Sequence, residues 1–402
     1  MKWGKVKVGD CCEVTSSKRI FFSEYVDSGV PFYRSKEIIE SSNGQAISEP
    51  LFISQEKYDE IKNHFGVPQS GDMLLTSVGT IGVPYIVREK DYFYFKDGNL
   101  TWFRNFSDEL DSKYLYFWVK SSEGQSILNN TTIGSSQKAL TIASLKGLEI
   151  PCPPSPVQKR IVEFLAGYDD LIENNQKQIK LLEEAAQRLY KEWFVDLRFP
   201  GHETTPIVDG IPQGWERMVL SEVTSVLKRG ISPKYSDNGK YSVINQKCIR
   251  SSIMDISESR RQEKEYVPTL NLQDSDTVIC STGTGTLGRV GRVYGDYPNT
   301  TFDSHVTLVR AKENPNYIYH VVKSQQEYLM GMGRGSTNQQ ELYRDVIERL
   351  VVLCPSQDIL LKADRVLNAI HCKIKAVYLQ NNLLVESRDR LLPKLISGEL
   401  EV

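Results

Sequence analysis

The sequence predicts a mixed α/β (α+β) protein with two similar globular domains. Two long antiparallel helices are expected to join the domains as a coiled coil, which would relate them by a pseudo-twofold axis. Two observations lead to this prediction. The chain repeats its landmarks once, about 202 residues apart, and each copy ends in a long segment with heptad-spaced apolar residues. A length of 402 residues is enough for two or three domains.

The second half of the chain repeats short sequences of the first half in the same order. The segment Gly134–Leu140 returns as Gly335–Leu342, and the proline of each following Cys-Pro pair returns after 202 residues, as Pro153 and Pro355. Three further pairs keep the same order: Trp3 with Trp215, residues 76–82 with 281–288, and residues 95–104 with 302–310. A period this long indicates a duplicated domain, because solenoid repeats are far shorter.

Each Cys-Pro pair precedes a segment with the spacing of a coiled-coil helix. From Ser155 to about Val195 the only glycine is Gly167, and no proline follows Pro156. The steps between seam positions alternate between three and four residues. The first seam is Ile161, Leu165, Tyr168, Ile172, Asn175, Ile179, Leu182, Ala186, Leu189 and Trp193. The second is Leu360, Ala363, Leu367, Ile370, Ile374, Val377, Asn381, Leu384, Arg388, Leu391 and Leu395.

A helix with one apolar seam needs a partner, and the other copy is the obvious one. An antiparallel pair is favoured because it would relate two like domains by a twofold axis. Ser155 before Pro156 predicts a capped helix start, and Gly398 predicts the end of the second helix. The seam contains Asn175, Asn381 and Arg388, which would either set the register or mark a contact with another protein. The alternative is a pair of ordinary core helices.

Bulk properties exclude several classes of protein. No run of about 18 apolar residues exists, so no membrane span is expected, and the first residues lack the apolar region of a signal peptide. The seven cysteines form no C-x-x-C pair, which argues against metal ligation and disulfides and favours a cytoplasmic protein. The net charge of −2 is unusual for a DNA-binding protein, unless a partner supplies most phosphate contacts.

No motif in the chain predicts catalysis. Residues 283–288 match G-x-G-x-x-G, but the following Arg289–Tyr294 alternates like a strand, whereas a dinucleotide site needs a helix there. We therefore interpret this segment, and its counterpart before Pro84, as glycine turns between strands. The chain has no P-loop and no Asn/Asp-Pro-Pro-Tyr/Phe run of adenine methyltransferases. No catalytic or metal-binding residue is expected.

Polar loops at matched places of the two halves are candidate DNA-binding elements, although such loops are often plain surface turns. Arg, Lys, Asn and Gln read base edges, while Ser and Thr also hold phosphates. The candidates in the first half are Arg34, Ser35, Lys36, Thr80, Ser135, Ser136, Gln137 and Lys138. Those in the second half are Asn245, Gln246, Lys247, Thr284, Thr286, Arg289, Ser336, Thr337, Asn338, Gln339 and Gln340.

Two segments resemble a known family. Residues 182–203, LEEAAQRLYKEWFVDLRFPGHE, look like the central conserved region of type I restriction-modification specificity (S) subunits. Residues 390–400, RLLPKLISGEL, look like the closing segment of the same family. The resemblance covers the whole chain. It implies a target-recognition domain at 1–154, a central conserved helix at 155–199, a second target-recognition domain at 200–355 and a C-terminal conserved helix at 356–402.

The resemblance implies a non-catalytic subunit that binds double-stranded DNA. Its partners would be two methyltransferase (M) subunits and two restriction/translocase (R) subunits. It implies no cofactor in this chain, S-adenosylmethionine in the M partner, and ATP with Mg²⁺ in the R partner. Each domain would read half of a bipartite target, while the helices set the spacer. Leu171, Leu181, Phe194 and Val195 lie outside the seam and are expected to dock the partner. The alternative is a stand-alone architectural or transcriptional DNA-binding protein.

Overall fold

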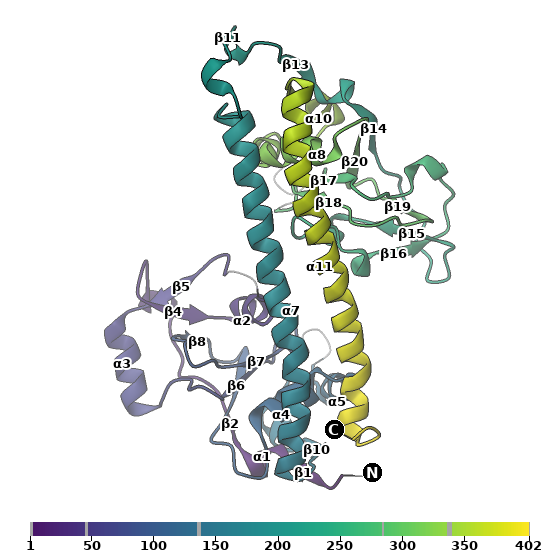
Figure 1. Cartoon of the computed structure of the whole chain (residues 1–402). Helices are drawn as coiled ribbons and strands as arrows, with labels where there is room; N and C mark the ends of the chain where they lie inside the picture. Colours follow the sequence, from purple (N-terminus) through teal and green to yellow (C-terminus); the bar gives the residue numbers. More distant parts are fainter. Residues whose placement is uncertain (1–2, 45–46, 135–137, 284, 336–339, 402) are drawn as a thin grey trace. The chain divides into compact units, whose positions relative to one another are not determined.

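The chain forms two compact units that each contain parts of both long helices. The computed structural model describes residues 3–44, 47–134, 138–283, 285–335 and 340–401 (Figure 1). One unit comprises Met1–Asn175 and Gln380–Val402, and the other comprises Gln176–Leu379. The long helices are α7 (Ser155–Tyr190) and α11 (Gln357–Ser397), and α7 continues as a π-helical turn at Lys191–Val195. Among the described residues, no helix is both long and apolar enough to span a membrane.

The first unit contains two four-stranded sheets and a two-stranded ladder. One sheet has the order β2-β9-β6-β7 and is antiparallel throughout, whereas the other has the order β3-β5-β4-β8 with β4 and β8 parallel. The strands are β1 (Lys5–Lys7), β2 (Glu13–Thr15), β3 (Tyr25–Val26), β4 (Val30–Tyr33), β5 (Leu51–Ile53), β6 (Met73–Thr76), β7 (Pro84–Ile86), β8 (Tyr94–Phe95), β9 (Leu100–Arg104) and β10 (Glu149–Pro151). The shorter helices are α1 (Val8–Cys11), α2 (Ser35–Ser42), α3 (Gln55–His64), α4 (Ser112–Lys120), α5 (Ser122–Thr131) and α6 (Ile142–Lys146).

The second unit repeats this topology. Its larger sheet has the order β14-β20-β17-β18, and its smaller sheet has the order β16-β15-β19, with β15 and β19 parallel. The strands are β11 (Ile207–Val208), β12 (Ile211–Pro212), β13 (Glu216–Val219), β14 (Thr224–Arg229), β15 (Tyr241–Ile244), β16 (Arg260–Gln262), β17 (Thr277–Cys280), β18 (Val290–Arg292), β19 (Thr300–Phe302), β20 (Val306–Ala311) and β21 (Val351–Cys354). The shorter helices are α8 (Pro315–Ser324), α9 (Gln326–Gly331) and α10 (Arg344–Glu348).

The repeat extends to individual hydrogen bonds. The hydroxyls of Ser77 and Thr101 lie 2.7 Å apart in the first unit, and those of Ser281 and Thr307 lie 2.6 Å apart in the second. Ser77 also accepts a backbone hydrogen bond from Leu140 at 2.9 Å, as Ser281 does from Leu342 at 2.8 Å. Matching buried bonds at matching strand ends confirm that the chain contains the same domain twice.

The predicted glycine turns join neighbouring antiparallel strands. β6 pairs with β7 and β17 pairs with β18, so the segments between them are β-turn connections rather than helix starts. Gly288 has a φ of +77°, and an added Cβ would lie 2.6 Å from the backbone nitrogen of Met330. Only glycine fits such a turn without strain. The interpretation of these segments as glycine turns between strands is confirmed.

The two long helices run antiparallel within each unit. In the first unit Ile161 and Leu165, near the start of α7, share a core with Leu392, Leu395 and Ile396 at the end of α11. In the second unit the order is reversed, since the end of α7 packs near the start of α11. The residues that show this are Tyr190 and Phe194 with Ile359 and Ala363, and Ile179 and Leu182 with Ile370 and Ile374. All predicted seam residues are buried or half-buried. A pseudo-twofold axis between the two units stays a prediction.

The polar seam residues contact the opposite helix. Asn175 donates a hydrogen bond to the side-chain oxygen of Asn381 at 2.9 Å, and Asn381 donates to the carbonyl of Ile172 at 3.3 Å. Arg388 forms an ion pair with Asp169 at 2.5 Å. Any shift along the helices would leave these polar groups buried without partners, which is costly. The contacts support a role in setting the helix register.

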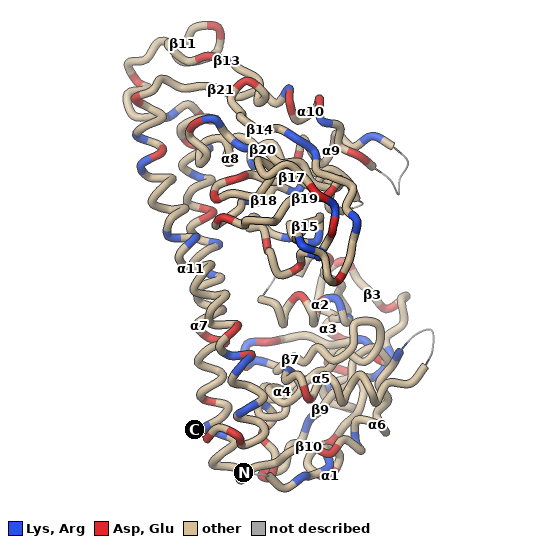
Figure 2. Tube along the Cα trace, turned by 90° about the vertical axis from the view of Figure 1, so that its right-hand side faces the viewer, with Lys and Arg blue, Asp and Glu red and all other residues tan. Residues whose placement is uncertain are grey.

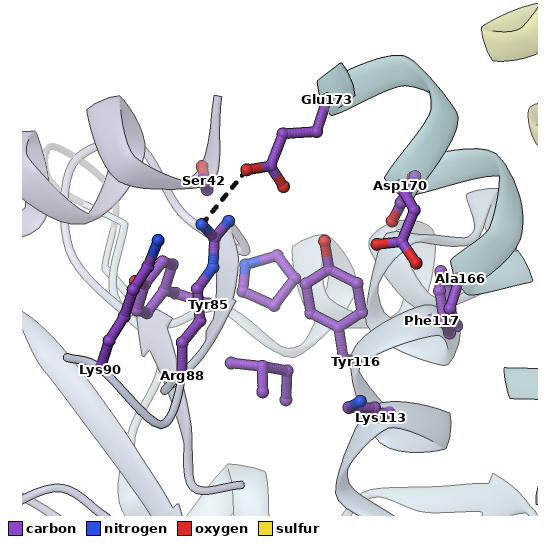
Figure 3. Close-up of a pocket in the computed structure, with 13 residues that line it drawn as sticks. Ser42, Tyr85, Arg88, Lys90, Lys113, Tyr116, Phe117, Ala166, Asp170 and Glu173 are labelled. Carbon is purple, nitrogen blue, oxygen red and sulfur yellow. Dashed lines mark ion pairs between the residues drawn. The ribbon is translucent and has the colours of Figure 1, made fainter. Parts of the chain in front are cut away.

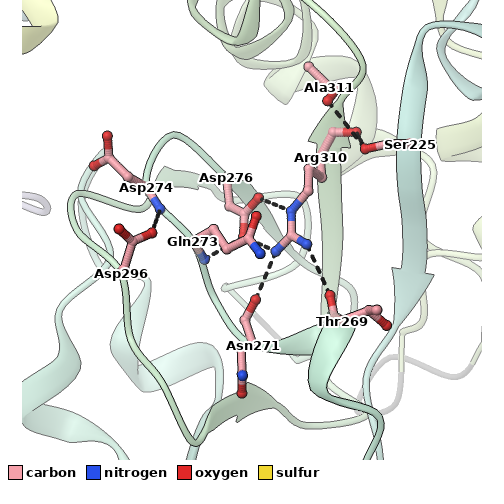
Figure 4. A network of polar contacts seen from close by, with 9 residues as sticks. All are labelled: Ser225, Thr269, Asn271, Gln273, Asp274, Asp276, Asp296, Arg310 and Ala311. Carbon is pink, nitrogen blue, oxygen red and sulfur yellow. Dashed lines mark hydrogen bonds and ion pairs between the residues drawn. The ribbon is translucent and has the colours of Figure 1, made fainter.

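An ion pair joins the ends of the two central strands, β17 and β20, of the larger sheet in the second unit (Figure 4). The Arg310 guanidinium donates two hydrogen bonds to the Asp276 carboxylate, both at 2.7 Å, and further bonds to the carbonyls of Thr269 and Asn271. Burial raises the pKa of Asp276, and the bonds from Arg310 and from the backbone of Gln273 oppose that shift. In the first unit the equivalent Asp72 accepts a bond from the Trp102 indole at 2.8 Å. The aspartate position is kept while its partner differs.

Two buried histidines link the second domain to α11. The Nε2 atoms of His320 on α8 and His371 on α11 lie 3.0 Å apart, and the Tyr294 hydroxyl lies 2.8 Å from Nδ1 of His371. If Tyr294 donates to Nδ1, the proton of His371 is on Nε2 and faces His320. Burial, aided by the charge of nearby Arg292, lowers the pKa of His320 to about 3 and that of His371 to about 2. Both histidines are therefore neutral when folded.

We expect these histidines to make folding stability fall with acidification. A histidine in the unfolded chain binds a proton near pH ~6.5, whereas the folded pair stays neutral down to pH values near about 3. The free energy of unfolding is therefore highest above pH ~6.5 and falls below it by up to about 1.4 kcal/mol per pH unit for each histidine.

The paired variant His320→Gln with His371→Gln should show a shallower decrease, measured by urea unfolding between pH ~7 and pH ~5. His64→Gln, which changes an exposed histidine on α3, is the control. Equal pH slopes for the paired variant and the unmodified chain would contradict the prediction.

Candidate nucleic-acid interface

Three candidate loops meet at one place in the first unit. The carbonyl of Asn99 accepts hydrogen bonds from the Ser35 hydroxyl at 3.4 Å and from the Ser77 backbone at 2.8 Å. Val78 forms an isolated β-bridge with Ala139. These contacts bring together the loop with Arg34–Lys36, the turn with Thr80 and the loop with Lys138.

The equivalent loops meet in the second unit. Ile244, which precedes the Asn245–Lys247 loop, accepts a backbone hydrogen bond from Asp303 at 2.9 Å. Ser281 donates to the carbonyl of His305 at 2.8 Å, and Thr282 forms a β-bridge with Glu341. The glycine turn and the loop that contains Gln340 therefore join the same surface. The sequence identified the three loops separately, and the fold brings them together twice.

The basic candidates of the first loop are paired with carboxylates. Arg34 forms an ion pair with the buried Glu37 at 2.5 Å, and its hydrogen bond to Glu37 raises the pKa of Arg34. Lys36 forms a more exposed pair with Glu49 at 2.9 Å. An exposed pair contributes little stability, so Lys36 can exchange Glu49 for a phosphate at small cost. Arg34 is held more firmly and supports the start of α2.

Several hydroxyl and amide candidates support their own loops. Asn245 is buried, and its side-chain oxygen accepts the backbone N–H of Lys247 at 2.8 Å. The Thr286 hydroxyl donates to the carbonyl of Thr282 at 2.9 Å. The burial of Asn245 differs from the exposure that a base-reading residue requires. Its position as the cap of the 3-10 turn η5 (Gln246–Cys248) explains the difference, since it orients the exposed Lys247.

The remaining candidates differ in exposure. Thr80, Lys138 and Lys247 are exposed, whereas Gln246, Arg289 and Gln340 are half-buried. The other candidates lie outside the described residues: Ser135, Ser136, Gln137, Thr284, Ser336, Thr337, Asn338 and Gln339.

Acidic and basic residues alternate along both units (Figure 2), in agreement with the net charge of −2. The described residues contain no group of three His, Cys, Asp or Glu side chains placed to hold a metal ion.

Sequence reasoning missed basic and aromatic residues beside the loops. In the first unit Arg19, Phe21, Phe22 and Lys96 line a cleft of about 570 Å³ together with the selected candidate Arg34. In the second unit Arg229 forms an ion pair with Glu341. Arg19, Phe21, Phe22 and Arg229 lie outside the matched segments of the two halves, so the search for repeats gave no signal for them. High aromatic and basic content between two matched strands would have been the usable signal.

A second pocket in the first unit has a different chemical character. It encloses about 350 Å³ between α4, β7 and α7, and Arg88 and Glu173 form an ion pair at 3.6 Å beside it (Figure 3). Its lining mixes basic Lys90 and Lys113 with acidic Asp169 and Asp170. A polyanion would meet both attraction and repulsion there. The cleft beside Asn99 is the better candidate for contact with DNA.

The helices carry exposed apolar residues outside their seam. Leu171, Leu181 and Val195 are more than half exposed, as expected. Phe194 differs from the expectation, because it is buried and its ring lies 4.7 Å from that of Tyr317 and 6.0 Å from that of Trp215. The π-helical turn at the end of α7 places Phe194 in the core of the second unit. Further exposed residues on α11, which the sequence analysis did not select, are Leu361, Val366, Leu379 and Leu383.

Comparisons with known proteins agree with the repeated fold. A family model described as "Type I restriction modification DNA specificity domain" matches residues 1–184 and 212–359. The MjaIX type I restriction enzyme specificity subunit of Methanocaldococcus jannaschii is 28% identical over 424 residues, covering 100% of this chain and 94% of the relative. The HindI specificity subunit of Haemophilus influenzae is 22% identical over 335 residues, covering 65% and 71%.

A solved structure shares the fold. The crystal structure of the type I restriction-modification S subunit from M. genitalium has a TM-score of 0.57 and 16% identity, covering 98% of this chain and 96% of that chain. The family model matches both repeats and most of the sequence. The chain therefore belongs to the family of type I restriction-modification DNA specificity subunits, and its role is DNA recognition.

Proposed function

We propose that each unit reads one half of a bipartite DNA target on behalf of methyltransferase subunits. The observation that carries this proposal is the meeting of three polar loops at the same place in both repeats. The framework bonds around Ser77 and Ser281 match, whereas the loop side chains differ. Two similar frames with different reading residues are expected to recognise two different half-sites.

The partners and cofactors follow from the family and are part of the proposal. Two methyltransferase subunits would carry S-adenosylmethionine, and two restriction subunits would carry ATP with Mg²⁺, while this chain binds none of them. A partner that supplies phosphate contacts is consistent with the net charge of −2. The family match does not favour the alternative of a stand-alone architectural or transcriptional DNA-binding protein.

Exchange of the first domain tests the assignment of one half-site to each unit. Residues 1–150 are replaced by the equivalent region of another specificity subunit, and the hybrid is co-expressed with its methyltransferase. We expect one half of the methylated motif to change while the other half and the spacer stay the same. Sequencing of methylated bases in genomic DNA measures the outcome. A simultaneous change in both half-sites would rule out two independent readers.

The exposed apolar residues of the helices are proposed to bind the methyltransferase. The side chains of Leu171 and Leu181 are exposed, and a bound partner would cover them. We expect the double variant Leu171→Ser with Leu181→Ser to bind the methyltransferase at least about 10-fold more weakly, because each lost side chain removes ~1 kcal/mol or more of apolar burial.

Co-purification and titration calorimetry measure this loss. The matched control is Ile207→Ser, at an exposed position of the β11–β12 hairpin. Unchanged methyltransferase affinity of the double variant would exclude this docking surface.

The helices are also proposed to set the spacer between the half-sites. Removal of one heptad from each helix, at matched places, keeps the seam in phase and shortens the pair by about 10 Å. At ~3.4 Å per base pair, the spacer should shrink by up to about three base pairs. Three base pairs also rotate the duplex by roughly a third of a turn. If this rotation misaligns the second reader, the shortened variant loses methylation instead of showing a shorter spacer. Methylated-base sequencing measures the outcome. An active variant that keeps the original spacer would show that the helices do not set the spacer length.

A further inference from the structure

A short turn in the first unit presents an unusually exposed aromatic residue. The 3-10 helix η1 (Phe22–Glu24) follows β2, and Phe22 is 87% exposed while the adjacent Phe21 is 61% exposed. Phe22 is the most exposed large apolar side chain in the described part of the chain. It contributes little to the core, so its exposure points to contact with another molecule.

The turn is held in a fixed conformation. The carboxylate of Glu24 accepts the backbone N–H of Phe21 at 2.8 Å and forms an ion pair with Lys57 of α3 at 3.1 Å. The ring of Phe22 meets the ring of Tyr25 edge-on, with 5.5 Å between their centroids. Phe22 is therefore presented from a rigid turn, which reduces the entropy lost on binding.

The surroundings of Phe22 favour a polyanion. The cleft of about 570 Å³ beside it is lined by the cations Arg19, Arg34 and Lys96 and by one carboxylate, Asp97. The same cleft is lined by Asn99, whose carbonyl joins the Arg34–Lys36 loop to the strand end at Ser77. Phe22 thus borders the surface where the three candidate loops meet.

The second unit has an aromatic residue and a cation in the equivalent connection. Tyr235 lies between β14 and β15 and bridges to Gln262 of β16, as Tyr25 pairs with Ile53 of β5. The guanidinium of Arg260 lies 3.6 Å from the ring centroid of Tyr235, which is partly exposed. The connection recurs in the repeat while its residues differ, which is the behaviour expected of a sequence-reading element.

We propose that Phe22 contacts DNA bases and determines part of the first half-site through a thymine methyl group. This inference rests on the proposed function of the chain. A phenylalanine has no hydrogen-bonding group, so the apolar feature of a major-groove edge that it can recognise is the C5-methyl of thymine. Arg19 and Lys96 line the same cleft, and their positive charges suit contact with phosphates of the DNA. The connection from β2 to β4 is then a fourth reading element besides the three polar loops.

The test compares thymine with uracil at the first half-site. The chain is co-expressed with its methyltransferase, and its motif is found by sequencing methylated bases. The complex is then titrated with short duplexes of that motif in which single thymines are replaced by uracil, which lacks only the methyl group. We expect one replacement to weaken binding of the unmodified complex by about 5-fold. Phe22→Ala should weaken binding to the thymine duplex by a similar factor and be insensitive to that replacement.

Two matched variants separate this contact from other effects. Phe65→Ala truncates another exposed phenylalanine outside the cleft and should leave the motif and the affinity unchanged. Arg19→Ala should reduce the slope of log affinity against log salt by about one unit, because one phosphate contact is lost, whereas Phe22→Ala should leave the slope unchanged. Second half-site specificity, measured in the same sequencing experiment, should be the same in all variants.

The outcomes separate this inference from the function on which it rests. An unmodified chain that directs no methylation at a bipartite motif would overturn both. A bipartite motif that persists unchanged in Phe22→Ala, a first half-site without thymine, or equal uracil sensitivity in the two complexes would overturn the role of Phe22 alone. Relaxed specificity at one thymine of the first half-site, with the second half intact, would support it.

Discussion

The packing of α7 against α11 is the contact on which both units depend. Ile161 and Leu165 of α7 complete the core of the first unit with Leu395, which lies 230 residues further along the chain than Leu165. In the second unit, Ala363 of α11 belongs to the same core as Tyr190 at the end of α7. The first unit is formed by two segments far apart in the sequence, Met1–Asn175 and Gln380–Val402, so its core is complete only when the end of the chain has been made.

Buried polar groups give this apolar seam its specificity. Leucine and isoleucine seams tolerate more than one register, since each shift by a heptad matches similar residues. The bond between Asn175 and Asn381 exists in one register alone, and the ion pair of Arg388 with Asp169 adds a second constraint within the same unit. In the second unit His320 and His371 make a comparable polar contact between a domain helix and α11. Burying these polar groups costs stability, but it restricts α7 and α11 to one alignment.

The duplicated domain separates a constant framework from variable loops. The paired hydroxyls of Ser77 with Thr101 and of Ser281 with Thr307 close the same strand ends, so the three loops leave the sheet in the same way in both units. Exposed side chains on these loops, such as Thr80, Lys138 and Lys247, lie outside the cores and are free to differ. The aromatic residues on the connection from β2 to β4 and on its counterpart follow the same pattern. A recognition protein can thus change its target without changing its fold.

The sequence by itself determined the duplication, the two long helices and their seam, and the glycine turn between β17 and β18. These features are periodic or local, and periodicity is preserved in the order of residues. The antiparallel direction could be argued only from symmetry, because a connection as long as a domain leaves the direction open. The structure settles it, because Ile161 and Leu165 near the start of α7 share a core with Leu392 and Leu395 near the end of α11.

Tertiary structure alone decided which candidate residues are available at the interface. Asn245 has the side chain of a base-reading residue, but in the structure it is a buried cap of η5. Phe194 was expected to be exposed on α7, but the π-helical turn at the end of α7 places it in the core of the second unit. Phe22 and Arg19 gave no repeat signal, because the residues of a reading surface diverge while the framework of the domain persists. Burial and partner choice depend on contacts between segments far apart in the chain, and residue order carries no direct record of them.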